Sequence, residues 1–349
     1  MSKNIVIFSD GTRQIGGKGS NTNVYKLFNM IEDRVPGQIA YYDPGVGSDR
    51  RKVLGSISGI GFTRNILDCY RFIFENFEAD DRIYLFGFSR GAATVRSLSA
   101  FVHLFGVLPK SRPDLIKQAF SIYKHSSKKN LKKNADAFIQ KHHTMWCKIE
   151  FLGVWDTVAA LGLPIKWISM LLDHMFPYTF HTFDLSESVT FARQALAIDD
   201  ERKTFHPLLW NTLTDDPDKI RMKQVWFAGV HTDVGGGYAE DALSNISLLW
   251  MMREATDKGL RIYTKSPAYQ SLISEKPNAN GIMHNEQKSF PGKYFKRVQR
   301  SWNTQTHGEP CIHESVFERT QNADNTSEPA YSPWIVNCIN KANPCIEPW

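Results

Sequence analysis

The residue with the clearest chemical signature in this sequence is Ser89, at the centre of the pentapeptide GFSRG (residues 87–91). An apolar, strand-prone run precedes the pentapeptide at residues 83–86, and a helix with an apolar face is expected after it. Glycines two positions either side of a serine let a strand and a helix approach closely, so the serine occupies a tight turn with its hydroxyl exposed. This pattern predicts a nucleophile elbow. The alternative is a plain strand–turn–helix in which Ser89 only caps the helix.

An activated serine needs a general base, and the base needs a carboxylate that orients it. Two later apolar runs end in suitable residues: FLGVWD ends at Asp156 and WFAGVH ends at His231. The order Ser, Asp, His is the one expected for a nucleophile elbow of this kind. Three glycines, residues 235–237, follow His231 and suggest backbone that crowds a site. The alternatives are a helix N-cap for Asp156 and a hydrogen-bonded structural role for His231.

A second triad is compatible with the same serine. Asp233 and His313 also lie beyond Ser89 in the order acid, then base. His313 lies late in the chain, where the histidine of this type of fold more usually sits. The runner-up triad is therefore Ser89, Asp233 and His313.

Acyl transfer also requires backbone N–H donors for the oxyanion. One donor is expected to be the N–H of Arg90, which follows the nucleophile. The other is expected from Gly11 or Thr12, because SDGT at residues 9–12 ends the first apolar run. The alternative for this tetrapeptide is an ordinary turn.

The elements that must position these residues alternate between buried strands and helices. Helices are expected over 64–78 and 90–105, and strands over 4–10, 38–43, 82–89, 147–156 and 223–231. Continuous apolar strands separated by helices favour a mostly parallel central sheet with helices on both faces. The fold class predicted is α/β, of the α/β-hydrolase type with helical cap or insertions. The strands ending at residues 88, 155 and 230 are expected side by side, which would bring Ser89, Asp156 and His231 to one edge.

The 349 residues are expected to form one such domain with three insertions. The first insertion (about 110–146) looks helical and basic. The second (161–222) begins with an apolar segment at 161–180, and the third (264–310) looks long and irregular because it is rich in Pro, Asn, Gly and Ser. The last forty residues show no clear periodicity.

The composition narrows the function classes. A net charge of +6 with 42% hydrophobic residues does not indicate a dedicated nucleic-acid binder. The five cysteines are scattered without a C-x-x-C, so free thiols are expected rather than a disulfide framework or a metal site. The histidine pair at 142–143 lacks spaced carboxylate ligands, and neither a metal nor another cofactor is expected. The lack of a signal peptide or an uncharged spanning segment predicts a soluble cytoplasmic protein.

Six ordered blocks carry a resemblance. They are IVIFSDGT, NTNVYKLF, YYDPGVGSD, LFGFSRGAATVRSL, FLGVWDTVAALG and VWFAGVHTDVGGGYAEDALSNISLLWM, between about residues 4 and 255. The sequence resembles the uncharacterised α/β-hydrolase domain family that includes type VI secretion phospholipase effectors and related fungal proteins. The resemblance implies a triad of Ser89, Asp156 and His231, and ester hydrolysis on lipids. It also implies a secretion-apparatus or immunity partner and delivery outside the cell for effector members.

The function expected is a serine hydrolase of carboxylic esters, most simply a phospholipase or lipase. A soluble esterase or thioesterase acting on a small substrate is the alternative. A non-catalytic interaction module on a hydrolase fold is the alternative of another class. Residues 161–180 are a candidate amphipathic lid or a buried cap helix. A lysine stripe is a candidate for peripheral membrane contact or a merely solvated face, and comprises Lys124, Lys128, Lys129, Lys132 and Lys133.

Overall fold

The computed structural model describes residues 2–11, 16–45, 59–127, 129–158, 184–212, 220–286, 295–321, 330–339, 342 and 344–349. Within them, one eight-stranded sheet has the order β2-β1-β3-β4-β5-β6-β7-β8, and every neighbouring pair is parallel. The strands are β1 Asn4–Ser9, β2 Gln38–Asp43, β3 Arg82–Phe88, β4 Ile149–Trp155, β5 Val189–Ala197, β6 Met222–Phe227, β7 Cys311–His313 and β8 Cys345–Glu347. The five predicted strands are therefore confirmed.

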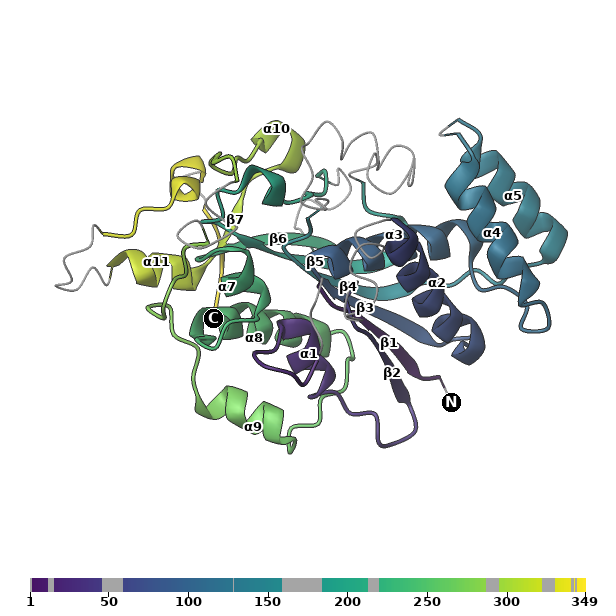
Figure 1. Cartoon of the computed structure of the whole chain (residues 1–349), viewed down its shortest axis with the longest axis horizontal. Coiled ribbons are helices and arrows are strands. Elements are labelled where there is room, and N and C mark those ends of the chain that lie inside the picture. The colour runs from purple at the N-terminus through teal and green to yellow at the C-terminus, as the bar shows by residue number, and fades with distance from the viewer. Residues whose placement is uncertain are drawn as a thin grey trace.

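Helices cover both faces of the sheet (Figure 1). On one face lie α2 Gly59–Asn76 and α3 Arg90–Phe105, with α4 Asp114–His125 and α5 Leu131–His142 packed against α3. On the other lie α1 Asn23–Phe28, α7 His231–Gly235, α8 Ala242–Thr256 and α9 Pro267–Ser274. The remaining helical elements are η2 Lys203–Phe205, α10 Thr304–His307, α11 Glu314–Gln321 and η4 Trp334–Cys338.

Apolar residues alternate between these two layers along the central strands. In β3, Ile83 and Leu85 pack under α2 and α3, whereas Tyr84 and Phe86 pack under α1 and α8. Because side chains in a strand point to opposite faces in turn, a strand covered on both faces must be largely apolar on both of them. That requirement explains the uninterrupted apolar runs of the sequence. The parallel sheet with two helical layers is an α/β-hydrolase-like fold.

The strand order corrects one expectation. The strands that end near Ser89 and Asp156 are neighbours, but β5 lies between β4 and β6. The strand β5 belongs to the segment 161–222, which was expected to be an insertion. Its sequence, VTFARQALA, mixes polar and small residues with apolar ones, so it lacks the continuous apolar run that identified the other central strands.

The C-terminal part of the chain corrects another expectation. Cys311 of β7 and Cys345 of β8 face each other across the two strands and form a disulfide, whereas Cys69, Cys147 and Cys338 are free. The prediction of free thiols throughout was wrong for this pair, because 34 residues separate the two cysteines and no spacing pattern announces their contact.

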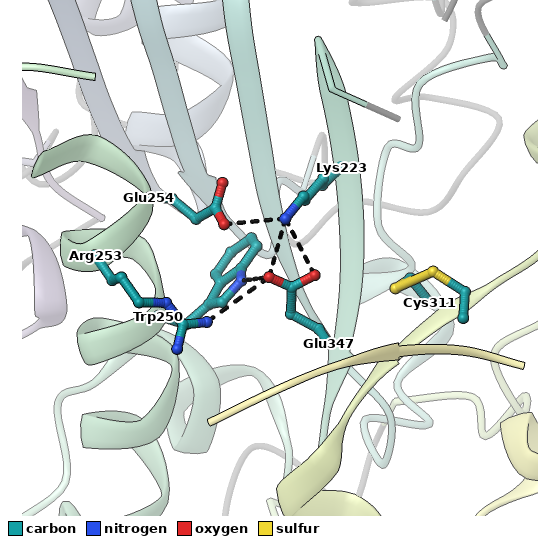
Figure 2. Close-up of a disulfide and its surroundings, with 7 residues drawn as sticks. Lys223, Trp250, Arg253, Glu254, Cys311 and Glu347 are labelled. Carbon is teal, nitrogen blue, oxygen red and sulfur yellow. Dashed lines mark hydrogen bonds and ion pairs between the residues drawn. A yellow bond between two sulfur atoms is a disulfide. The ribbon is translucent and has the colours of Figure 1, made fainter. Parts of the chain in front are cut away.

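Glu347, the last residue of β8, holds this strand through hydrogen bonds and ion pairs (Figure 2). Its carboxylate accepts hydrogen bonds from Lys223 Nζ at 3.0 and 3.2 Å and from Trp250 Nε1 at 3.1 Å. Lys223 also reaches Glu254 at 3.0 Å, so the strand is tied to both β6 and α8. The final residues, which show no periodicity in sequence, thus form an ordered edge of the sheet.

The basic insertion forms the helical hairpin α4–α5, which extends from the side of the molecule (Figure 1). Lys129, Lys132 and Lys133 are exposed there, while Lys128 lies outside the described residues. The candidate lid at 161–180 also lies outside them. In the part of the chain that is described, no helix is both long and apolar enough to cross a membrane.

Candidate active site

Ser89 sits at a sharp turn between β3 and α3. Its φ of 57° and ψ of −118° fall in a region that non-glycine residues rarely adopt. The turn requires both flanking glycines: a Cβ on Gly87 would lie 2.5 Å from the carbonyl oxygen of Gly91. The Ser89 N–H donates to Trp155 O at 3.1 Å, which fixes the turn against β4. This geometry is that of a nucleophile elbow.

The end of β1 lies directly against the elbow. A Cβ on Gly91 would lie 2.0 Å from Ser9 O and 2.6 Å from Asp10 O, so only glycine permits this approach. The neighbouring Gly11 is a candidate oxyanion donor. In this structure its N–H donates a hydrogen bond to Asp10 Oδ1 at 2.7 Å. The other candidate of that turn, Thr12, lies outside the described residues.

A buried network holds the first strand end in place. Asp10 Oδ2 accepts hydrogen bonds from Thr22 Oγ1 and Tyr42 Oη, both at 2.7 Å. Burial raises the pKa of Asp10, and these two hydroxyl donors counteract that rise.

The first strand end also lies at a switch point of the sheet. The strand order reverses between β1 and β3, and ligands of open α/β sheets bind outside the strand ends at such a point.

Asp156 and His231 meet at the same edge of the sheet. Nδ1 of His231 lies 2.6 Å from Oδ2 of Asp156, and both residues are buried. Asp156 follows β4 directly with a φ of 37°, and its Oδ1 accepts the N–H of Ala197 at 3.1 Å. A carboxylate on Nδ1 orients the imidazole and leaves Nε2 as the basic nitrogen.

The position of His231 depends on the turn that follows β6. Gly229 has a φ of 109°, and a Cβ there would lie 2.4 Å from Cβ of Asp233. Its N–H donates to Asp199 Oδ2 at 2.7 Å, and the N–H of His231 donates to Asp200 Oδ2 at 3.2 Å. These two adjacent carboxylates hold the backbone as it turns from β6 into α7, where His231 is the first residue.

Aromatic packing places the His231 ring next to the residue that precedes Ser89. The ring of Phe88, the residue before Ser89, lies 4.6 Å from the ring of His231, and Phe205 packs edge-on at 5.2 Å. Gly235 makes this approach feasible, because a Cβ there would lie 2.0 Å from the Phe88 ring. Among the described residues, neither Ser89 Oγ nor His231 Nε2 has a hydrogen-bond partner.

The sequence gives no indication of a further residue at this site, Arg300. Its Nη1 lies 2.6 Å from Asp156 Oδ1 and its Nη2 lies 2.8 Å from Asp156 Oδ2, a bidentate pair. Burial by itself would raise the pKa of Asp156, but Arg300 and the hydrogen bond with His231 hold it well below its usual range. Arg300 lies in the 264–310 insertion, where the irregular sequence offers no period or motif that could single it out.

The runner-up pairing is arranged differently. Asp233 Oδ1 lies 2.6 Å from Nδ1 of His284, and its Oδ2 accepts the N–H groups of Val230 and His284, each at 3.0 Å. His313 is buried against Phe227, with ring centroids 4.8 Å apart. The structure therefore pairs Asp233 with His284 and not with His313.

Residues 3–254 match the model of the family described as T6SS, Phospholipase effector Tle1-like, catalytic domain. The chain belongs to this family.

Individual relatives share between 17% and 30% of their aligned residues with this chain. The uncharacterized protein YEL023C of Saccharomyces cerevisiae is 30% identical over 236 residues, which are 60% of this chain and 33% of the yeast protein. This chain thus matches about a third of that relative's length. A solved, uncharacterized protein from Pseudomonas aeruginosa has 17% identity and a TM-score of 0.45, covering 78% of this chain and 48% of its own. The Tle1 effector bound to the VgrG spike has 18% identity and a TM-score of 0.38, covering 69% and 52%.

Proposed function

We propose that the chain is a serine ester hydrolase in which Ser89, His231 and Asp156 form the catalytic triad. Ser89 Oγ attacks the ester carbonyl while Nε2 of His231 takes its proton. The tetrahedral intermediate collapses to an acyl-enzyme, and the alcohol leaves with the proton from His231. Water activated by the same nitrogen then releases the carboxylic acid and restores Ser89.

The observation that carries the proposal is the 2.6 Å contact between Asp156 and His231 beside a strained serine elbow. A buried carboxylate that remains ionised stabilises the imidazolium formed during each proton transfer. Strained backbone at a functional position must be held by its surroundings, and here the glycines and the β1 end hold it. The alternative of a non-catalytic module gives no reason for this combination.

The oxyanion donors that we propose are backbone groups. Arg90 is the first residue of α3, and the first N–H groups of a helix lack intrahelical acceptors and point toward an approaching anion. The second donor comes from the turn after β1, at Gly11 or Thr12. Since Gly11 donates to Asp10 in this structure, a contribution from Gly11 requires this turn to move on substrate binding.

The substrate class that we propose is the carboxylic ester of a phospholipid. The family description supports this class, because it names phospholipase effectors. The association with a secretion spike belongs to the relative solved in that complex. A small soluble ester is the alternative substrate, and the preferred acyl length distinguishes the two.

The proposed mechanism is tested with a fluorophosphonate probe and a substrate panel. The probe should label the wild-type protein, and peptide mapping should place the adduct on Ser89. The panel should pair p-nitrophenyl butyrate with mixed phosphatidylcholine and phosphatidylglycerol vesicles, from which fatty acid release is measured. An adduct on another residue, or full activity of Ser89→Ala, contradicts the mechanism. Turnover of the short ester without release from vesicles contradicts only the lipid substrate.

A further inference from the structure

Arg300 uses its entire hydrogen-bonding capacity at the proposed active site. A guanidinium group carries five N–H donors. Two of them contact the carboxylate of Asp156, and the other three donate to carbonyl oxygens: Nε to Asp200 at 3.0 Å, Nη1 to Ala197 at 2.5 Å and Nη2 to Phe205 at 2.7 Å. The Arg300 side chain is 1% exposed. Each of the five donors therefore has an acceptor, as expected of a guanidinium group that its surroundings hold in one position.

The acceptors belong to two separate parts of the chain. Asp156 follows β4, Ala197 is the last residue of β5, and Asp200 and Phe205 lie in the segment that connects β5 to β6. This segment contacts the histidine twice, through Asp200 Oδ2 on the N–H of His231 and through the Phe205 ring on its imidazole. Arg300 thus binds the carboxylate of the pair and the segment that confines the base.

Charge gives a second reason for an arginine here. Asp156 is fully buried, and an isolated buried carboxylate is strongly disfavoured. A buried ion pair is maintained only when its geometry is good and the remaining donors are satisfied. Arg300 meets both conditions, and His231 need not be protonated to compensate the charge of Asp156.

Asp156 Oδ2 has two donors, His231 Nδ1 at 2.6 Å and Arg300 Nη2 at 2.8 Å. With Oδ1 held by Arg300 Nη1 and the N–H of Ala197, the carboxylate has no rotational freedom. From this geometry we infer that Arg300 is a positioning residue of the catalytic triad, keeping Asp156 ionised and in the one orientation that accepts Nδ1–H of His231. The inference rests on the proposed function and extends it to a residue of the third insertion.

The test compares three variants with wild type. Arg300→Met removes the charge and all five donors at similar volume, and Arg300→Lys keeps the charge but not the planar fork. Arg297→Met is the control, because Arg297 lies three residues away, is exposed and, among the residues that the structure describes, forms an ion pair only with Glu201, at 2.7 Å. Melting curves establish that each variant is folded before kinetics are measured.

The expected kinetic result is a loss in kcat with little change in KM. Loss of triad orientation costs up to about 10⁴-fold in kcat, so Arg300→Met is expected to lose roughly 10²- to 10³-fold. Arg300→Lys is expected to lose roughly tenfold because the charge remains. Arg297→Met should match wild type. If Arg300→Met does not fold, the lysine variant decides, and a lysine variant with wild-type kcat overturns the inference.

A second readout does not depend on ester turnover. The hydrogen-bonded Nδ1–H of His231 should give a far-downfield proton NMR signal, assigned by its absence from His231→Gln. We expect it in wild type and Arg297→Met, and we expect it displaced or absent in the Arg300 variants. An unchanged signal in those variants overturns the inference. Failure of the proposed function is a separate result, seen when wild type shows this signal yet neither turns over esters nor is labelled at Ser89.

Discussion

Oδ2 of Asp156 and Nδ1 of His231 lie 2.6 Å apart, although 75 residues separate them and β5 lies between the strands that precede them. The gap left by the intervening strand is bridged because Asp156 turns out of β4 with a positive φ and the chain after β6 turns at Gly229. The pair is thus made by two turns rather than by adjacent strand ends. Substitutions in these two turns should therefore affect the contact between Asp156 and His231.

Asp156→Asn should abolish most of the activity without changing the shape of the site. The amide keeps the volume but lacks the charge and favours the wrong imidazole tautomer, which costs about 10⁴-fold in kcat for an equivalent triad. The measurement is kcat with p-nitrophenyl butyrate. The matched control is Asp233→Asn, whose carboxylate pairs with His284. Asp233→Asn removes no group of the proposed triad and keeps an oxygen that can accept the Val230 N–H, so it is expected to lose far less of kcat than Asp156→Asn.

If instead Asp233→Asn is the inactive variant and Asp156→Asn is active, the acid of the triad is Asp233 and the assignment made above is wrong. His284→Gln would then be the variant to measure next, because His284 is the histidine that Asp233 contacts.

Gly91→Ala should disrupt the elbow. Its Cβ would lie 2.0 Å from the backbone oxygen of Ser9, a contact that no flexible side chain can relieve. Overpacking of this kind typically costs about 1–3 kcal/mol, and movement of the elbow should remove ester hydrolysis as well. The free energy of unfolding from urea titration and the rate of fluorophosphonate labelling check the two effects.

Gly19→Ala is the control for backbone strain alone. Gly19 has a φ of 71°, but a Cβ there would meet nothing within 4 Å. It should cost about 1 kcal/mol of stability and leave labelling unchanged. Equal behaviour of the two alanine variants would show that the close approach of β1 to α3 is not needed.

His313 should make the protein less stable in acid. Burial and the nearby Arg253 lower the pKa of His313 from 6.5 to about 3. Between these values the unfolded chain binds a proton that the folded protein excludes, so stability present above pH 6.5 is lost as the pH falls toward 3. The contribution is about 1.4 kcal/mol for each pH unit.

The prediction is checked by urea unfolding of wild type and His313→Gln between pH 7 and pH 4. The difference between their unfolding free energies should shift in favour of the variant as the pH falls. His125→Gln, at an exposed position of α4, is the control and should run parallel to wild type. A constant difference between wild type and His313→Gln would mean that His313 titrates normally.

The disulfide should stabilise the last strand of the sheet. Closing a loop of 34 residues contributes about 3–4 kcal/mol in the chain-entropy description. Cys345→Ser, or wild type in dithiothreitol, should therefore melt at a lower temperature than oxidised wild type. Cys338→Ser is the control because Cys338 is a free thiol. Identical melting with and without reductant would contradict a stabilising role for this bond.

The sequence by itself determined the elbow and the strands that flank it. GFSRG between an apolar strand and a helix is a local signal, because the two glycines are required by backbone contacts within a few residues or with the adjacent strand end. Runs that are largely apolar on both faces likewise identify strands covered by helices on both sides, as in β1, β3, β4 and the second half of β6. Asp156 and His231 could be predicted from the sequence for the same reason, since each closely follows such a run.

Only the tertiary structure decided how those elements are connected and which side chains become partners. The place of β5, the pairing of Asp233 with His284, the Cys311–Cys345 bond and the contact of Arg300 with Asp156 all join segments that are distant in sequence. Periodicity records which face of an element is buried, but it does not record the partner on the other side. A buried charge acquires its partner from whatever the complete fold brings within hydrogen-bonding distance, and for Asp156 that partner is an arginine 144 residues further along the chain.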